Sequence, residues 1–97
     1  MIKVIAHIEA LPEHLETVLR IQKEAVEVTL QEPGCIEYAL FQQLDAPHRL
    51  TFVETWASEE ALKVHMETPY MAEKAQRLSG MLAGKDVRLM QAVPRNE

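Results

Sequence analysis

The order of its secondary-structure segments restricts the fold of this chain more than any other feature. The five prolines fall at segment boundaries, where a break in regular structure is tolerated. Residue patterns predict strands over residues 2–9, 35–43, 49–56 and 85–92, and helices over residues 12–31, about 59–66 and 69 to about 79. The order β-α-β-β-α-α-β predicts an α+β fold. It is the ferredoxin-like split β-α-β arrangement, with a four-stranded antiparallel sheet and its second helix broken in two.

Local signals define the segment ends. Ser58 and Thr68 are good N-cap residues, and Pro69 occupies a first helical position, where a missing N–H costs nothing. Pro33 ends the first helix because it disfavours helical geometry in the residue before it. Residues 44–48 form a short connection, which predicts a hairpin with His48 in its turn. A short tail, residues 93–97, follows the last strand.

Length and charge exclude several classes of protein. Ninety-seven residues are enough for one domain, so residues 1–97 are expected to form a single unit. The net charge is −5 and no Lys/Arg cluster occurs, which argues against a nucleic-acid partner. No apolar run approaches the ~20 residues of a membrane span, and the N-terminus lacks a signal-peptide pattern, so no membrane association and a cytoplasmic location are expected.

Both faces of the expected sheet are apolar, although the helices can cover only one. One alternating set holds Ile2, Val4, Ala6, Ile8, Ile36, Tyr38, Leu40, Leu50, Phe52 and Trp56. The opposite set holds Ile5, Cys35, Ala39, Phe41, Val53 and Met90. An exposed apolar face of this size needs a cover, and a second copy of the chain is the simplest one. The sequence therefore predicts a homodimer that packs sheet against sheet.

Glu54 is the strongest local anomaly. It lies between Phe52 and Trp56 on an otherwise apolar strand face. A carboxylate there must be paired, hydrogen-bonded or protonated. Two interpretations stay open. Glu54 either has a structural explanation, as an ion pair, for example with Arg88, or as a strand end open to water, or it is a group that burial prepares for proton transfer near neutral pH.

His65 is expected on the side of its short helix that faces the sheet, where the strand-to-helix turn folds it back over Glu54. A Glu54–His65 pair would supply an acid and a base. The alternative is a core histidine without a function. Trp56 and Tyr38 are either core residues or walls of a pocket for a planar ligand.

Other chemistry has weaker support. No spacing typical of metal ligands occurs, so no metal site is expected. The three glycines do not form a phosphate-binding loop. Cys35 has no adjacent base and is expected to be a structural strand cysteine.

Three groups of residues resemble the antibiotic biosynthesis monooxygenase family. They are Glu32-Pro33-Gly34-Cys35, Glu54-Thr55-Trp56, and the run from Glu60-Ala61-Leu62 through His65-Met66 to Thr68-Pro69-Tyr70. The resemblance covers essentially the whole chain. It implies ferredoxin-like subunits that dimerise through their sheets, in agreement with the independent argument from two apolar faces.

The resemblance also implies a choice of activities. Quinol monooxygenases and polyketide-tailoring members oxidise electron-rich phenols or quinols with dioxygen, without metal or flavin. Other members degrade haem or isomerise phosphorylated autoinducer-2. Ala75 stands where the haem-degrading members have an axial histidine, His7 stands where they have an asparagine, and Phe52 replaces a polar residue of the polyketide group.

The sequence therefore favours a cofactor-independent monooxygenase acting on a small quinol-like or phenolic substrate. Glu54 and His65 are the expected catalytic residues. The expected substrate-binding residues are Trp56, Tyr38, Tyr70, Phe52 and His7. The alternatives are an isomerase of a small phosphorylated hydroxyketone and a non-catalytic dimeric protein that binds a small molecule.

Overall fold

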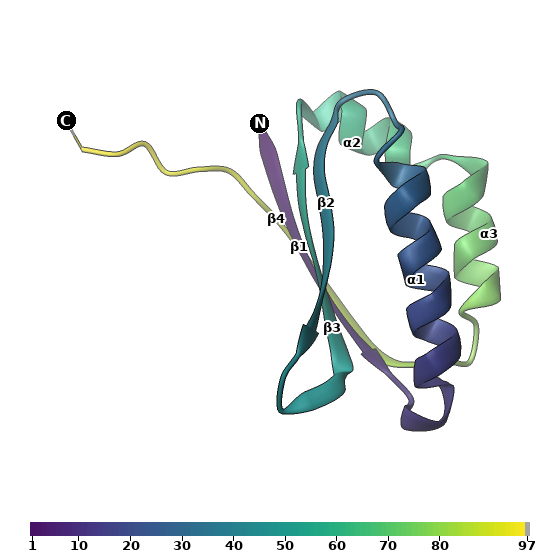
Figure 1. Ribbon diagram of the computed structural model, residues 1–97. Coiled ribbons are helices and arrows are strands. Elements are labelled where there is room, and N and C mark those ends of the chain that lie inside the picture. Colours follow the sequence, from purple (N-terminus) through teal and green to yellow (C-terminus); the bar gives the residue numbers. More distant parts are fainter. Residues whose placement is uncertain (97) are drawn as a thin grey trace.

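The computed structural model describes residues 1–96 and contains one four-stranded sheet with helices on one side (Figure 1). The strands are β1 (Ile2–Ala10), β2 (Cys35–Gln43), β3 (Ala46–Trp56) and β4 (Leu82–Met90). The helices are α1 (Leu15–Thr29), α2 (Glu59–Met66) and α3 (Pro69–Arg77), and a short 3-10 turn, η1 (Pro12–His14), precedes α1. The strand order β2-β3-β1-β4, antiparallel at every pairing, confirms the ferredoxin-like topology. No described helix has the length and apolar character needed to cross a bilayer.

Three strands have other bounds than expected, and β1 differs least, since it continues by one residue to Ala10. β3 begins at Ala46, so the hairpin turn is shorter than expected and His48 lies on the strand, 3.3 Å from Glu9. β4 begins and ends earlier than residues 85–92, because its ends follow its pairing with β1 from Lys3–Met90 to Ala10–Leu82. The expected tail leaves the body as an extended segment (Figure 1), and its last residue, Glu97, lies outside the described residues.

The expected caps of the two short helices are present. The Ser58 hydroxyl accepts a hydrogen bond from the Ala61 N–H at 3.1 Å, and the Thr68 hydroxyl accepts one from the Met71 N–H at 3.3 Å. Gly34 has a φ of +83°, and a Cβ at this position would lie 2.5 Å from the Ala61 Cβ. The backbone before β2 therefore approaches α2 closely, which holds α2 at one end of the sheet.

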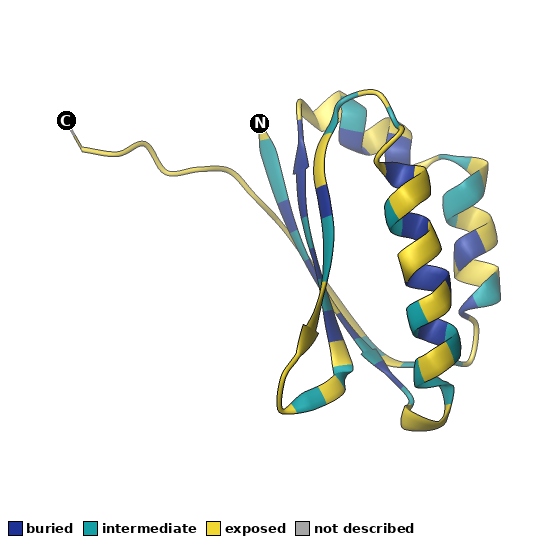
Figure 2. Cartoon of the chain, viewed as in Figure 1, coloured by how far each residue is buried: buried dark blue, intermediate teal, exposed yellow. Residues whose placement is uncertain are grey.

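The core lies between the sheet and the inner sides of the helices (Figure 2). Its larger cluster contains Val4, Ala6, Ile8, Tyr38, Phe52, Trp56 and Leu62. One expected face assignment is wrong, because β2 shifts its register against β3 between Cys35 and Glu37. Cys35 consequently packs against this core, while the side chain of Ile36 is 54% exposed.

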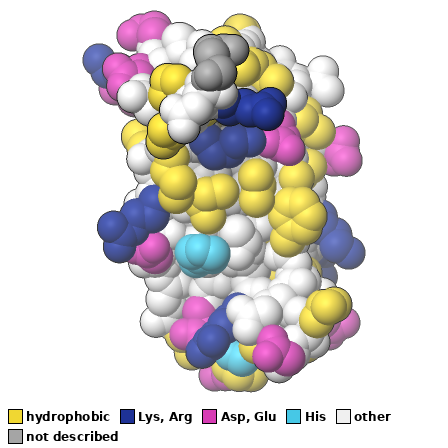
Figure 3. All heavy atoms as spheres, turned by 90° about the vertical axis from the view of Figure 1, so that its left-hand side faces the viewer, with side chains coloured by type: hydrophobic (Ala, Val, Ile, Leu, Met, Phe, Trp, Pro, Cys, Tyr) yellow, Lys and Arg dark blue, Asp and Glu magenta, His cyan; other side chains and the backbone are white. Residues whose placement is uncertain are grey.

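The opposite face of the sheet has no helix over it. Figure 3 views this face and shows hydrophobic side chains gathered over its upper and middle part, with charged side chains among and around them. Ile5, Ala39, Phe41, Val53 and Met90 lie on it, as expected from their alternation with buried neighbours.

A polar network occupies one end of this face. Lys3 Nζ donates to the Thr55 hydroxyl at 2.7 Å and to Glu37 at 3.0 Å, and the Thr55 hydroxyl donates to Glu37 at 2.9 Å. The open face therefore combines an apolar surface with a fixed set of charges.

Candidate active site

A cavity of about 430 Å³ lies between the sheet and the helices. Most of its wall is apolar, with side chains from β1, β3, α2 and α3 such as Val4, Ala6, Phe52, Leu62 and Met71. The wall continues onto β4, where Val87 and Leu89 are 40% and 62% exposed. The volume is in the range of small-molecule sites, and the cavity wall is exposed at its β4 side.

Glu54 lines this cavity. The strand alternation turns it inward between Phe52 and Trp56, and it is 6% exposed. Its Oε1 accepts a hydrogen bond from the Trp56 indole N–H at 2.9 Å. Burial raises the pKa of the Glu54 carboxyl, and this effect outweighs the opposing effects of the indole N–H, His65 and Lys74.

The alternative of a Glu54–Arg88 ion pair is wrong. Arg88 pairs with Ile5 in the sheet register, so its side chain lies on the open face, where its Nε is 3.2 Å from Asp86. Glu54 thus retains a carboxyl oxygen that no described cation neutralises by direct contact.

His65 lies in the same cavity wall, but its hydrogen-bond partner is Glu32 rather than Glu54. Its Nδ1 is 3.0 Å from both carboxylate oxygens of Glu32, and its ring packs on the Trp56 indole with a centroid distance of 4.6 Å. Because an ionised carboxylate only accepts hydrogen bonds, Nδ1 must carry the proton. Nε2 is then the ring nitrogen available to a ligand.

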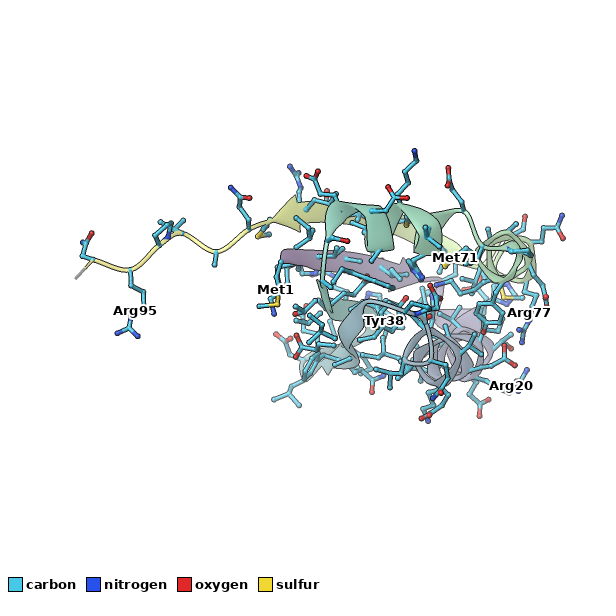
Figure 4. The ribbon with its side chains drawn as sticks, turned by 90° about the horizontal axis from the view of Figure 1, so that it is seen from above. Met1, Arg20, Tyr38, Met71, Arg77 and Arg95 are labelled. Carbon is cyan, nitrogen blue, oxygen red and sulfur yellow. The ribbon has the colours of Figure 1, made fainter. Side chains whose placement is uncertain are left out.

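Two of the expected binding aromatics line the cavity and a third supports it. Tyr38 and Phe52 contribute to the wall, with ring centroids 4.9 Å apart. Figure 4 shows Tyr38 and Met71 in the interior, with Arg20 and Arg77 toward the outer side of the helices. Trp56 is fully buried behind the wall, where it holds Glu54 and His65 in place. Burial, and secondarily the charge of Glu54, raises the pKa of the Tyr38 phenol, which therefore stays neutral.

The structure does not bring Tyr70 or His7 to this cavity. The Tyr70 hydroxyl donates to Glu24 on α1 at 2.7 Å, and burial together with this hydrogen bond raises its pKa to about 12. His7 is exposed on the open face, where its Nδ1 is 2.9 Å from the Thr51 hydroxyl. Tyr70 thus joins two helices, and His7 belongs to the opposite side of the sheet.

Two buried polar residues of the cavity were not expected. Lys74 on α3 is 8% exposed, with its Nζ 5.4 Å from the Phe52 ring centroid, and burial lowers the pKa of its ammonium. Gln22 on α1 is 1% exposed, and its Oε1 has no hydrogen-bond partner among residues 1–96. Both lie on the inward-facing sides of their helices. A polar residue within an apolar helical stripe was therefore the sequence feature from which these two cavity residues could have been predicted.

The remaining candidate chemistries find little support. Burial and the charges of Glu32 and Glu54 raise the pKa of the Cys35 thiol to about 11, so the thiol is not ionised near neutral pH. Within residues 1–96, no three His, Cys, Asp or Glu side chains are grouped as a metal site would require.

The sheet topology and the cavity define the class: a ferredoxin-like α+β protein with a cavity between sheet and helices. The model of the antibiotic biosynthesis monooxygenase family matches residues 1–77. The chain belongs to this family, as the three sequence motifs predicted.

Individual relatives agree with this assignment. The probable quinol monooxygenase YgiN of Escherichia coli strain K12 is 30% identical, over 94% of this chain and 97% of its own. An uncharacterised protein of Synechocystis sp. strain PCC 6803 is 29% identical over 84% of this chain, which spans only 56% of that protein. A crystal structure of an antibiotic biosynthesis monooxygenase superposes with a TM-score of 0.91 at 36% identity, covering 97% of this chain and 100% of the other.

Proposed function

We propose that this protein is a cofactor-independent monooxygenase that oxidises a small quinol-like or phenolic substrate with dioxygen. The observation that carries the proposal is Glu54, a buried carboxylate with a raised pKa in the wall of an apolar cavity. The similarity to the probable quinol monooxygenase of E. coli supports the same substrate class.

In the proposed reaction, Glu54 removes the proton of a substrate hydroxyl. The resulting anion is electron-rich and passes an electron directly to dioxygen, and the substrate radical and superoxide then combine through a new C–O bond. One oxygen atom stays in the hydroxyquinone product, and the other leaves as water with two hydrogens of the quinol. The protein supplies a base and a water-poor pocket. The raised pKa suits Glu54 to this role, because a general base works best when its pKa lies near the working pH. The apolar wall shields the anion and the oxygen intermediates from solvent.

His65 is the second proposed catalytic group. Glu32 fixes its Nδ1–H, and Nε2 then exchanges a proton with the substrate or an intermediate. Tyr38 and Phe52 supply the aromatic wall for a planar ring.

Oxygen consumption tests the proposal. Metal-free protein is incubated with a panel of one- and two-ring quinols in an oxygen electrode, with heat-denatured protein as the background. We expect uptake above background for at least one quinol, and a product that retains one oxygen atom from ¹⁸O-labelled dioxygen by mass spectrometry. No uptake above background across the panel contradicts the proposal.

The alternative activity is isomerisation of a small phosphorylated hydroxyketone by the same Glu54 and His65. Lys85 supports it, because this exposed lysine lines the cavity at its β4 side and offers a cation to a phosphate group. The test is NMR of dihydroxyacetone phosphate incubated with the protein in deuterated water. Deuterium incorporation next to the carbonyl, faster than without protein and lost in Glu54→Gln, favours the isomerase, and its absence argues against it.

We also propose that the open sheet face binds a second copy of the chain. The apolar side chains on that face have no cover within one chain, and the two copies would pack these surfaces together.

A further inference from the structure

Among residues 1–96, Lys74 is the buried lysine in the wall of the cavity, and the mechanism proposed above does not use it. It projects from α3 toward the sheet and lies over the Phe52 ring, 8% exposed. The described part of the chain offers its ammonium no ion pair. A buried ammonium without an anionic partner is costly, and an anionic ligand in the cavity would offset that cost.

The surroundings of Lys74 define what that ligand must carry. Glu54 and Tyr38 face the cavity from the sheet, His65 from α2, Gln22 from α1 and Lys85 from β4. Glu54 attracts Lys74 through space, but the two side chains form no ion pair among the described residues. The Lys74 ammonium is therefore held by the cation–π interaction with Phe52 and remains open to an oxygen atom in the cavity.

A second observation indicates a ligand with polar groups. The Gln22 Oε1 is buried without a partner among the described residues, in the wall of the same cavity. Most buried polar side-chain atoms have a hydrogen-bond partner, and a donor group on a bound ligand would supply one to Gln22. The cavity thus presents a cation and an acceptor inside a wall that is otherwise mainly apolar.

We propose that Lys74 binds the substrate as an aromatic oxyanion, pairing its ammonium with the oxygen from which the proton has been removed. The inference rests on the proposed function for the origin of the anion. Glu54 takes the proton from the substrate O–H and becomes neutral, and the O–H bonding electrons remain on the substrate oxygen. The negative charge moves from Glu54 to the substrate while Lys74 stays positive, so the net charge of the cavity does not change.

This arrangement assigns each charge a separate role. Before proton transfer, Lys74 is stabilised through space by Glu54, and after transfer it contacts the oxyanion directly. The interaction between Lys74 and the substrate oxygen strengthens as negative charge develops on that oxygen, so it lowers the barrier to ionisation. An interaction of equal strength with the neutral and the ionised substrate would not lower this barrier. The apolar wall favours a phenolate, whose charge is spread over a ring, over a strongly hydrated phosphate dianion.

The ionisation of bound 4-nitrophenol tests the proposal without any turnover, because its phenolate form absorbs visible light. Full-length protein is titrated with the probe at several pH values, and the ionised fraction of the bound probe is compared with that of the free probe. In the wild type we expect at least about tenfold more phenolate relative to phenol than in solution at the same pH, the effect of a nearby opposite charge. Lys74→Met should abolish this enrichment and Lys74→Arg should retain part of it.

Two further variants separate Lys74 from general effects. Lys63→Met removes an exposed lysine of α2 and should leave the ionisation unchanged. Glu54→Gln removes the opposing charge and should increase the phenolate fraction, opposite to Lys74→Met. Circular dichroism spectra identify variants that fail to fold. If Lys74→Met fails to fold, the phenolate fraction of the wild type is compared with that of Lys74→Arg instead.

Several results would overturn the inference. The first is that folded Lys74→Met enriches phenolate as much as the wild type does. The second is that the bound probe is no more ionised than the free probe. The third is that inorganic phosphate binds tightly, displaces the probe and requires Lys74 for its binding. If the protein consumes no oxygen but shows the Lys74-dependent enrichment, the oxygenase proposal fails and the oxyanion site stands. If it consumes oxygen while folded Lys74→Met enriches phenolate normally, only the oxyanion site fails.

Discussion

At the scale of single residues, the site is a set of buried polar groups, each held by a different neighbour. Trp56 donates to Glu54, and Glu32 accepts from His65, so one carboxylate faces the cavity while the other orients an imidazole. Two carboxylates in unlike surroundings commonly have different roles in an active site. Burial raises the pKa of Glu54, the carboxylate in the cavity wall, and this suits it to the role of the base.

Glu54→Gln keeps the shape of this residue and its acceptor for the indole N–H but removes the base. We expect turnover to fall by about 10²- to 10⁴-fold, the usual contribution of a general base. The matched control is Glu60→Gln, an exposed residue in the first turn of α2. Steady-state oxygen uptake of both variants is the measurement, and unchanged turnover in Glu54→Gln would remove this residue from the mechanism.

The same substitution predicts a change in the pH dependence of stability. The folded protein raises the Glu54 pKa above its ordinary value of 4.5, so between these two values the native state binds more protons than the unfolded state. The free energy of unfolding of the wild type should therefore contain a component that is present below pH 4.5 and is lost as pH rises through the raised pKa. Urea unfolding at several pH values should show that Glu54→Gln lacks this component and is at least as stable as the wild type near pH 8.

Glu32 is expected to act through His65. Glu32→Gln replaces an obligatory acceptor by an amide that also donates, so the Nδ1–H tautomer loses its preference. We expect turnover to fall roughly 10- to 100-fold, in the range seen for residues that orient a functional histidine. NMR of ¹⁵N-labelled histidine should show the change in tautomer, with Glu67→Gln, exposed at the end of α2, as the control. An unchanged ring spectrum would contradict this role.

At the scale of elements, Gly34 fixes the position of α2 and therefore of His65. Its positive φ acts together with its close approach to α2, since a Cβ added at Gly34 would lie 2.5 Å from the Ala61 Cβ. Gly80, by contrast, has a φ of +78° and nothing within 4 Å of such a Cβ. The two glycines share a positive φ, and a Cβ would meet a close contact only at Gly34.

Gly34→Ala should therefore destabilise the protein more than Gly80→Ala. The backbone conformation alone costs about 1 kcal/mol, and the close contact adds about 1–3 kcal/mol. Urea unfolding measures both, and the double variant Gly34→Ala/Ala61→Gly should recover most of the difference. Equal losses in the two single variants would show that the contact with α2 is unimportant.

The elements also show how far local sequence patterns extend. The N-caps at Ser58 and Thr68 were predictable because a cap bonds within its own first turn. The ends of β4 were not, because pairing with β1 determines them. The exchange of faces between Cys35 and Ile36 depends on a register shift, which alternation alone does not encode.

At the scale of the whole molecule, the open sheet face predicts a dimer. Light scattering should give a mass twice that of the 11.1 kDa chain, about 22 kDa. Phe41→Glu places a charge at an exposed position of this face and should shift the mass toward that of one chain. The control is Leu44→Glu at the hairpin tip, where the residue is fully exposed in any case. A wild type that scatters as one chain contradicts the dimer.

The sequence by itself determined the order of the elements, the helix caps, the two apolar faces and the family, because these depend on periodicity and on residues near one another in the chain. It also identified Glu54, Phe52, Tyr38 and His65, since a polar or aromatic residue on a core-facing position is visible in a pattern. Only the tertiary structure decided that His65 pairs with Glu32, that Lys74 enters the cavity, and that His7 and Tyr70 do not. Those outcomes depend on strand register and on how helices distant in sequence pack over the sheet, and contacts between distant segments leave no periodic trace in a single sequence.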